Sequence, residues 1–145
     1  MGDGLTATDH PTRTFRREFS YPFEPNVDSA AYVKIPHHYF AGGFQGGKTL
    51  DYIRAMKAMK RGIDEDFRKN YTAIWNDESH WNKYLFDNPP AVILDVSYCY
   101  PDSLIEEYYN KIWPQKYKPK LITITKPFSV SKEAGKSIKN VIDSL

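Results

Sequence analysis

Two adjacent carboxylates, Asp77 and Glu78, stand in the segment WNDESHWNKYLFDNPP, with Trp75 before them and Trp81 after them. Asn76 or Asp77 suits the N-cap of a helix, whose first turn favours acidic side chains. We therefore expect both carboxylates to have depressed pKa values and to be ionised. An ionised carboxylate beside an aromatic wall can stabilise an oxocarbenium-like centre or attack it. The alternative, which the composition alone favours, is a capping pair on a solvated helix.

A second motif, GGFQGGKT at Gly42–Thr49, fits the pattern G-x-x-x-x-G-K-[ST] of phosphate-binding loops. In such a loop, backbone N–H groups would cradle phosphates, Lys48 would reach the β- and γ-phosphates, and Thr49 would hold Mg²⁺. The apolar run 91–94 ends in Asp95, as a magnesium-binding strand does. However, the preceding stretch HHYFA lacks the aliphatic run of a buried parallel strand. A glycine turn between a strand and a helix is the alternative.

The elements that must position these motifs alternate between strand and helix. Apolar spacing predicts strands at 38–44, 91–94 and 121–125, and helices at 49–69, 77–88, 103–112 and 131–145. Gly62 could end or kink the first helix. Residues 1–36 have no apolar period and are predicted to form a long loop. The alternation predicts a mixed α/β arrangement in a single domain, 1–145.

Composition excludes several classes of protein. The 145 residues are 41% hydrophobic and 26% charged, as in ordinary globular proteins. The sequence contains no apolar run that could span a membrane, and its N-terminus is too polar to be a signal peptide. A net charge of +2 is too small to indicate nucleic-acid binding. A single cysteine, Cys99, excludes an internal disulfide framework and a cysteine zinc site, so we expect a cytoplasmic protein. The aromatic content of 15% fits a surface that binds sugars, or a core edged with tyrosines.

Longer segments carry a resemblance to a known family. YFAGGFQGG at 39–47, followed by IWNDESHWNKYL at 74–85 and DNPPA at 87–91, resembles glycosyltransferase family 6, especially its bacterial members. This is the family of the histo-blood-group A and B transferases and α-1,3-galactosyltransferase. The resemblance runs from about Gly4 to Pro101. It implies a GT-A fold and retaining α-1,3 transfer of GalNAc or Gal from a UDP-sugar to a galactose-terminated glycan.

The resemblance also implies residue roles. Glu78 would act as the nucleophile or stabilise the oxocarbenium ion, and Asp77 would bind hydroxyls of the donor sugar. Gly43 leaves room for an N-acetyl group, which favours UDP-GalNAc over UDP-Gal. The implied acceptor site consists of His10, Ser20 and Trp75, and the remaining implied donor-binding residues are Ala41, Gly42, Lys126 and Lys132. The two lysines fall in the tail that closes over the pyrophosphate in the family.

The family's metal motif, D-x-D or N-x-N, lies upstream of the matched region, and no such motif precedes His10. The resemblance therefore assigns no metal ligand, and whether Mn²⁺ is a cofactor is left open. Asp64-Glu65-Asp66 is a literal D-x-D, but it lies downstream and is predicted to be a solvated helix face.

The resemblance covers the C-terminal, acceptor-binding part of the GT-A fold, without the N-terminal nucleotide-binding part. We therefore expect exposed edges and apolar faces on the strands near His38 and Ala91. Such surfaces predict self-association or pairing with a separately encoded N-terminal half.

Three functions remain: a family 6 glycosyltransferase, a P-loop nucleotide-binding protein, and a glycan-binding remnant without turnover. The long match around Asp77–Ser79 favours the transferase and makes the phosphate-loop pattern a coincidence.

Overall fold

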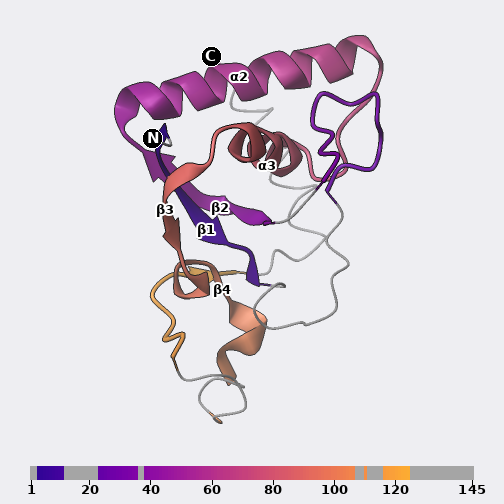
Figure 1. Ribbon diagram of the computed structural model, residues 1–145. Helices are drawn as coiled ribbons and strands as arrows, with labels where there is room; N and C mark the ends of the chain where they lie inside the picture. The colour runs from indigo at the N-terminus through magenta and orange to yellow at the C-terminus, as the bar shows by residue number, and fades with distance from the viewer. Residues whose placement is uncertain (1–2, 12–22, 36–37, 107–109, 111–115, 125–145) are drawn as a thin grey trace, which may run out of the picture.

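The fold is a mixed α/β arrangement, seen in a computed structural model that describes residues 3–11, 23–35, 38–106, 110 and 116–124 (Figure 1). Its main sheet has the strand order β2-β1-β3, formed by β1 (Asp3–Asp9), β2 (Phe40–Gly47) and β3 (Pro90–Leu94). The central strand β1 runs antiparallel to β2 and parallel to β3. The expected mixture of strands and helices is confirmed.

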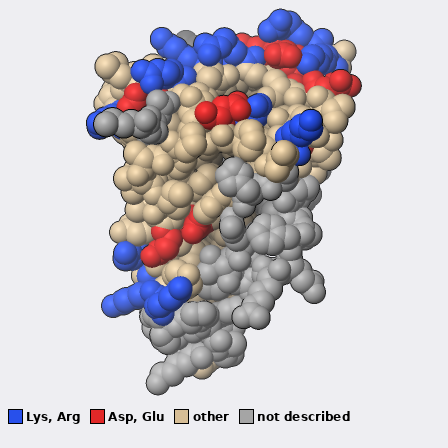
Figure 2. Space-filling model, viewed as in Figure 1, with Lys and Arg blue, Asp and Glu red and all other residues tan. Residues whose placement is uncertain are grey.

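Two helices, α2 (Thr49–Arg68) and α3 (Asp77–Asp87), pack on one face of this sheet. Their shared core is a cluster of buried apolar side chains from both helices and from β1 and β2, namely Leu5, Ala7, Phe40, Ala55, Met59, Trp81 and Leu85. The other face of α2 carries Lys, Arg, Asp and Glu (Figure 2), with i,i+4 ion pairs such as Lys60–Asp64. No helix among the described residues is long and apolar enough to cross a bilayer.

Short elements follow β3 and lie beyond the end of the main sheet (Figure 1). They are the 3-10 helices η1 (Val96–Cys99) and η2 (Asp102–Leu104) and the paired parallel strands β4 (Tyr100–Pro101) and β5 (Ile122–Thr123). The predicted strand at 121–125 is therefore confirmed in shorter form. The predicted helix at 103–112 lies partly, and that at 131–145 wholly, outside the described residues.

The prediction for α2 is confirmed, and Gly62 neither ends nor kinks the helix. The structure gives Gly62 a different role, because a Cβ there would lie 2.8 Å from Nδ1 of His80 on α3. The absent side chain lets the two helices approach closely.

The predicted loop over 1–36 is wrong for residues 3–9, which form the central strand of the sheet. Aspartate and glycine are depleted in strands, which hid the strand although its two threonines favour one. The signal was the alternation Leu5-Thr6-Ala7, in which Leu5 and Ala7 are fully buried against the helices.

The strand β3 was predicted to be buried, yet its side chains are largely exposed, with Val92 at 48% and Ile93 at 49%. Both β2 and β3 lie at sheet edges, as expected for the strands near His38 and Ala91. An apolar strand of this kind is ordinarily covered in a folded protein.

Candidate active site

The carboxylate of Glu78 projects from the first turn of α3 toward β2 and is held through both oxygens. The Tyr39 hydroxyl donates to Oε1 at 2.9 Å, and the Gly42 backbone N–H donates to Oε2 at 2.7 Å. The side chain is half-buried, so one part of it contacts the strand and another remains accessible. Charge-assisted hydrogen bonds of this kind fix a carboxylate in one orientation.

A bulge in β2 places Gly42 beside Glu78. Between the pairs Thr6–Gly46 and Thr8–Ala41, β1 has one residue and β2 has four, Gly42 to Gln45. The buried Thr8 hydroxyl donates to the Phe44 carbonyl at 2.8 Å and holds the bulge against β1. Bulges commonly re-aim groups next to active sites, and this one directs an N–H at a carboxylate.

The start of α3 is shaped by an unusual backbone conformation at Asn76. This residue has φ 50° and ψ −123°, a region that residues other than glycine rarely adopt. Such strain typically costs on the order of 1–3 kcal/mol and is common at functional sites. Asn76 is the N-cap by position, as predicted, but its side chain makes no capping hydrogen bond. Instead, Ser79 Oγ accepts from the Trp75 N–H at 3.1 Å.

The side chain of Asn82 ties α3 to β2 one turn after Glu78. Its Oδ1 accepts from the Phe40 N–H at 2.7 Å, and its Nδ2 donates to the Phe40 carbonyl at 2.9 Å. The same Nδ2 donates to the Glu78 carbonyl at 2.9 Å. The amide thus bonds the open edge of β2 as a neighbouring strand would, and it fixes Glu78 relative to that edge.

The expected depressed pKa of Glu78 is wrong. Burial raises the pKa of this carboxyl above its usual value, although the bonds from Gly42 and Tyr39 act in the opposite direction, and the charge of Asp77 raises it further. The prediction considered only the position of Glu78 at a helix start, where a carboxylate is ordinarily exposed to water. In the structure β2 packs against this carboxylate and shields it from water.

The residue just after β1, His10, lies against Tyr39. Its ring meets the Tyr39 ring edge-on at 5.6 Å, and burial lowers the pKa of His10 to about 4. The imidazole is therefore neutral at pH 7 and can offer a hydrogen bond to a hydroxyl without a charge. His10, Tyr39 and Glu78 form one contiguous chain of contacts.

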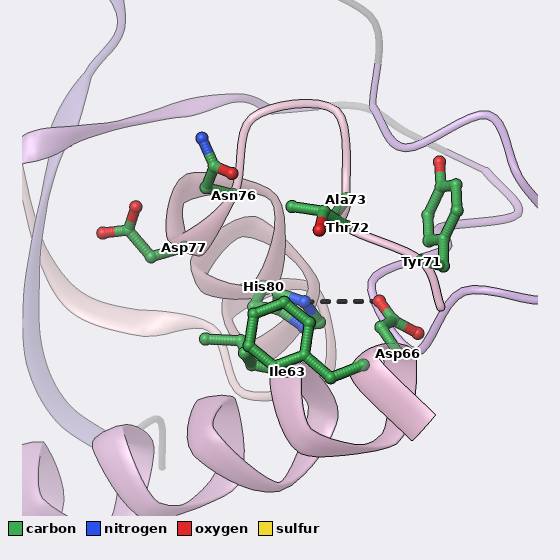
Figure 3. A pocket seen from close by; sticks show the side chains of 9 residues that line it. Ile63, Asp66, Tyr71, Thr72, Ala73, Asn76, Asp77 and His80 are labelled. Atoms are coloured by element: carbon green, nitrogen blue, oxygen red, sulfur yellow. Dashed lines mark ion pairs between the residues drawn. The ribbon is translucent and has the colours of Figure 1, made fainter. Parts of the chain in front are cut away.

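The neighbouring carboxylate Asp77 is exposed and lines a different space. A pocket of about 170 Å³ lies between α2, the start of α3 and the segment joining them (Figure 3). Within it, His80 Nε2 lies 3.4 Å from Asp66 Oδ2. Asp77 and Glu78 therefore point to different surroundings although they are adjacent in sequence.

The prediction of a solvated helix face at 64–66 is correct for Asp64 and Glu65 and wrong for Asp66. Asp66 is only 1% exposed, and its oxygens accept from Ser29 Oγ at 2.7 Å and the Ala30 N–H at 2.8 Å. It therefore anchors the segment around Ser29 to the end of α2.

The other predicted site residues occupy several environments. Ala41 is buried at the start of the bulge, whereas a Cβ at Gly43 would meet nothing within 4 Å. A Cβ at Gly42 would lie 3.1 Å from Glu78, so its small size serves that contact. Trp75 is 39% exposed and lies two residues before the carboxylate pair. Ser20, Lys126 and Lys132 lie outside the described residues.

The phosphate-loop interpretation fails on this geometry. Gly42 to Gly47 belong to a strand that runs antiparallel to β1, whereas a phosphate loop lies between a strand and a helix. Lys48 N–H donates to the Gly4 carbonyl at 2.8 Å, and Asp95 accepts from the Ser97 N–H at 2.8 Å as the cap of η1. These groups support local structure and do not form a phosphate cradle.

Within the part of the chain that the structure describes, no group of three or more His, Cys, Asp or Glu side chains could hold a metal ion. Sequence reasoning missed Tyr39, Thr8 and Asn82, which hold the carboxylate and the bulge. Their types carry no special signal, because each acts through a partner that is distant in sequence. Only the position of Tyr39 beside the glycine segment could have pointed to it.

A carboxylate that is held in one orientation and remains partly accessible can stabilise an oxocarbenium-like centre or attack it. The profile of Glycosyltransferase family 6 matches residues 5–126. The chain belongs to this family.

Curated relatives agree with the family. Histo-blood group ABO system transferase 1 of Rattus norvegicus is 34% identical over 103 residues, which cover 70% of this chain and 30% of the relative. O-antigen biosynthesis glycosyltransferase WbnI of Escherichia coli is 29% identical over 119 residues, 81% of this chain and 45% of the relative. The chain thus spans less than half the length of these relatives.

Proposed function

We propose that this chain forms the acceptor-side catalytic part of a retaining glycosyltransferase. The enzyme would transfer GalNAc, or Gal, from a UDP-sugar in α-1,3 linkage to a galactose-terminated glycan. The observation that carries the proposal is Glu78, held by Tyr39 and Gly42 inside the family match. A relative from Gallus gallus, 27% identical over 104 residues and thus 70% of this chain and 30% of the relative, is named globoside alpha-1,3-N-acetylgalactosaminyltransferase 1.

In this mechanism the bond between the anomeric carbon and UDP breaks, and UDP leaves with the bonding electrons. Glu78 stabilises the resulting positive charge or forms a transient bond to the anomeric carbon. The acceptor hydroxyl then forms the new bond on the face that UDP left, and its proton passes to the phosphate oxygen of the departing UDP. Asp77 would bind donor hydroxyls, and Trp75 and His10 would contact the acceptor.

Residues outside the described ranges have roles in the same proposal. Ser20 would contact the acceptor, and Lys126 and Lys132 would neutralise the charge of the leaving UDP.

The choice of donor sugar is proposed to depend on Gly43. Because a Cβ at this position meets open space, the volume beside it can hold an acetamido group. Gly43→Ala should therefore lower the ratio of kcat/KM for UDP-GalNAc to that for UDP-Gal by about 10-fold or more. The measurement is UDP release and acceptor product for each donor, made with this chain and with it joined to the remainder of the transferase.

The matched control is Gly46→Ala, because a Cβ at Gly46 also meets nothing within 4 Å but lies beyond the bulge. Gly46→Ala should leave the donor ratio unchanged. An unchanged ratio in Gly43→Ala would remove the reason for naming GalNAc. If the protein binds glycan but forms no product from either donor, the result would support the alternative function, a glycan-binding remnant that does not catalyse transfer.

The exposed apolar side chains of β3 indicate a surface that another segment of polypeptide covers. We propose that further polypeptide of the same transferase covers Val92 and Ile93, since the relatives extend well beyond the matched region. When that polypeptide is absent, the apolar strand should drive self-association.

Ile93→Lys should shift the chain from oligomer toward monomer in sedimentation velocity, because a charge at a sheet edge opposes pairing. Ile53→Lys is the control, since Ile53 is 43% exposed on α2, away from the strand edge. Identical sedimentation of the wild type and Ile93→Lys at every concentration would contradict this surface.

A further inference from the structure

We infer that Tyr39 is a positioning residue for the transfer reaction, because its hydroxyl and the Gly42 amide together hold the two oxygens of Glu78 in one orientation. The role in the reaction rests on the proposed function. The contact itself is independent of that function and can be measured separately.

The Tyr39 hydroxyl is aimed by its surroundings. The side chain is 2% exposed, and its ring meets the rings of His10 and Phe23 edge-on at 5.6 and 5.1 Å. Edge-on aromatic contacts favour defined ring orientations. With the ring fixed on both sides, the hydroxyl reaches Glu78 Oε1 from one direction.

The Tyr39 hydroxyl and the Gly42 N–H together form a clamp on the Glu78 carboxylate, and the Gly42 part of this clamp depends on the bulge. Tyr39 precedes β2 and Gly42 lies in its bulge, so the two donors come from one short segment and approach different oxygens of Glu78. Rotating the carboxylate would break at least one of these bonds. A Cβ at position 42 would lie 3.1 Å from Glu78, so a side chain there would press on the carboxylate and displace it.

Hydrogen bonds from Tyr39 and Gly42 favour the ionised carboxylate, whereas burial opposes it. Removing the Tyr39 hydroxyl should therefore raise the pKa of Glu78 further. It should also let the carboxylate turn, and a small misplacement of a reacting group can cost about 100-fold in rate.

The test is Tyr39→Phe, which keeps the ring and removes the hydroxyl. Titration of ¹³C-labelled glutamate carboxyls by NMR should show the Glu78 signal, assigned by its loss in Glu78→Gln, moving to higher pH. In the transferase, kcat should fall by about 10- to 100-fold with little change in donor KM. The acid limb of the kcat profile should move to higher pH.

Tyr71→Phe is the matched control, because its hydroxyl donates to another buried carboxylate, Glu24, at 2.6 Å. This variant should leave the Glu78 titration unchanged. Gly42→Ala is the second variant and should shift the same signal if Tyr39→Phe does not fold.

An unchanged Glu78 titration in folded Tyr39→Phe would overturn the inference. A shifted titration with full transfer by Glu78→Gln would uphold the clamp and overturn the catalytic assignment of Glu78.

Discussion

Glu78→Gln is expected to lower kcat for sugar transfer by about 100-fold or more while the protein stays folded. The neutral amide removes the negative charge that would face the anomeric carbon, and lost electrostatic stabilisation of this kind has effects of that size. The amide also fits the clamp, since its oxygen can accept from Gly42 and its NH₂ can donate to the Tyr39 oxygen. UDP release and acceptor product are the measurements.

The same substitution should change how stability depends on pH. Because the folded pKa of Glu78 is raised above its usual value of 4.5, the folded state binds more protons than the unfolded state in the window between the two values. Wild-type stability therefore falls as pH rises from 4.5 through the folded pKa. Thermal melts should show that this loss is absent in Glu78→Gln.

Asp77→Asn is the matched control for the stability effect, because Asp77 is exposed on the same helical turn. Because the Asp77 charge contributes to the raised pKa of Glu78, Asp77→Asn should weaken the loss of stability with rising pH, but it should not abolish that loss as Glu78→Gln does. Unchanged turnover in Glu78→Gln would refute the assignment of Glu78, whatever the melts show.

Local signals in the sequence were enough to predict both long helices. The apolar residues of α2 recur every three or four positions, and the Pro89–Pro90 pair ends α3, so no distant contact is needed to find these elements. The adjacent carboxylates were likewise visible as a candidate site from their types and spacing.

The features that the sequence analysis did not predict depend on contacts between residues that are distant in the sequence. The strand β1 is stable because β2 and β3 flank it, although its Asp and Gly residues are disfavoured in strands. Asp66 looked solvated within its helix, and it is buried by partners at Ser29 and Ala30. The raised pKa of Glu78 follows from the approach of β2, which no local pattern encodes.

Asn82→Leu is expected to destabilise the protein by about 2–4 kcal/mol, because the Phe40 N–H and C=O lose their partner where water has little access. Asn82 is only 2% exposed, so solvent does not readily replace the lost bonds. The melting temperature should fall by roughly 10 °C. Differential scanning calorimetry measures this change directly.

Asn88→Leu is the matched control, since the Asn88 side chain donates to the Tyr84 carbonyl at 3.0 Å at the end of the same helix and does not bond β2 there. Its cost should stay below about 1 kcal/mol. Equal melting temperatures for the two variants would show that the Asn82 amide does not hold the edge of β2. A larger loss for Asn82→Leu, together with weakened transfer, would show that this amide couples the stability of the sheet edge to the placement of Glu78.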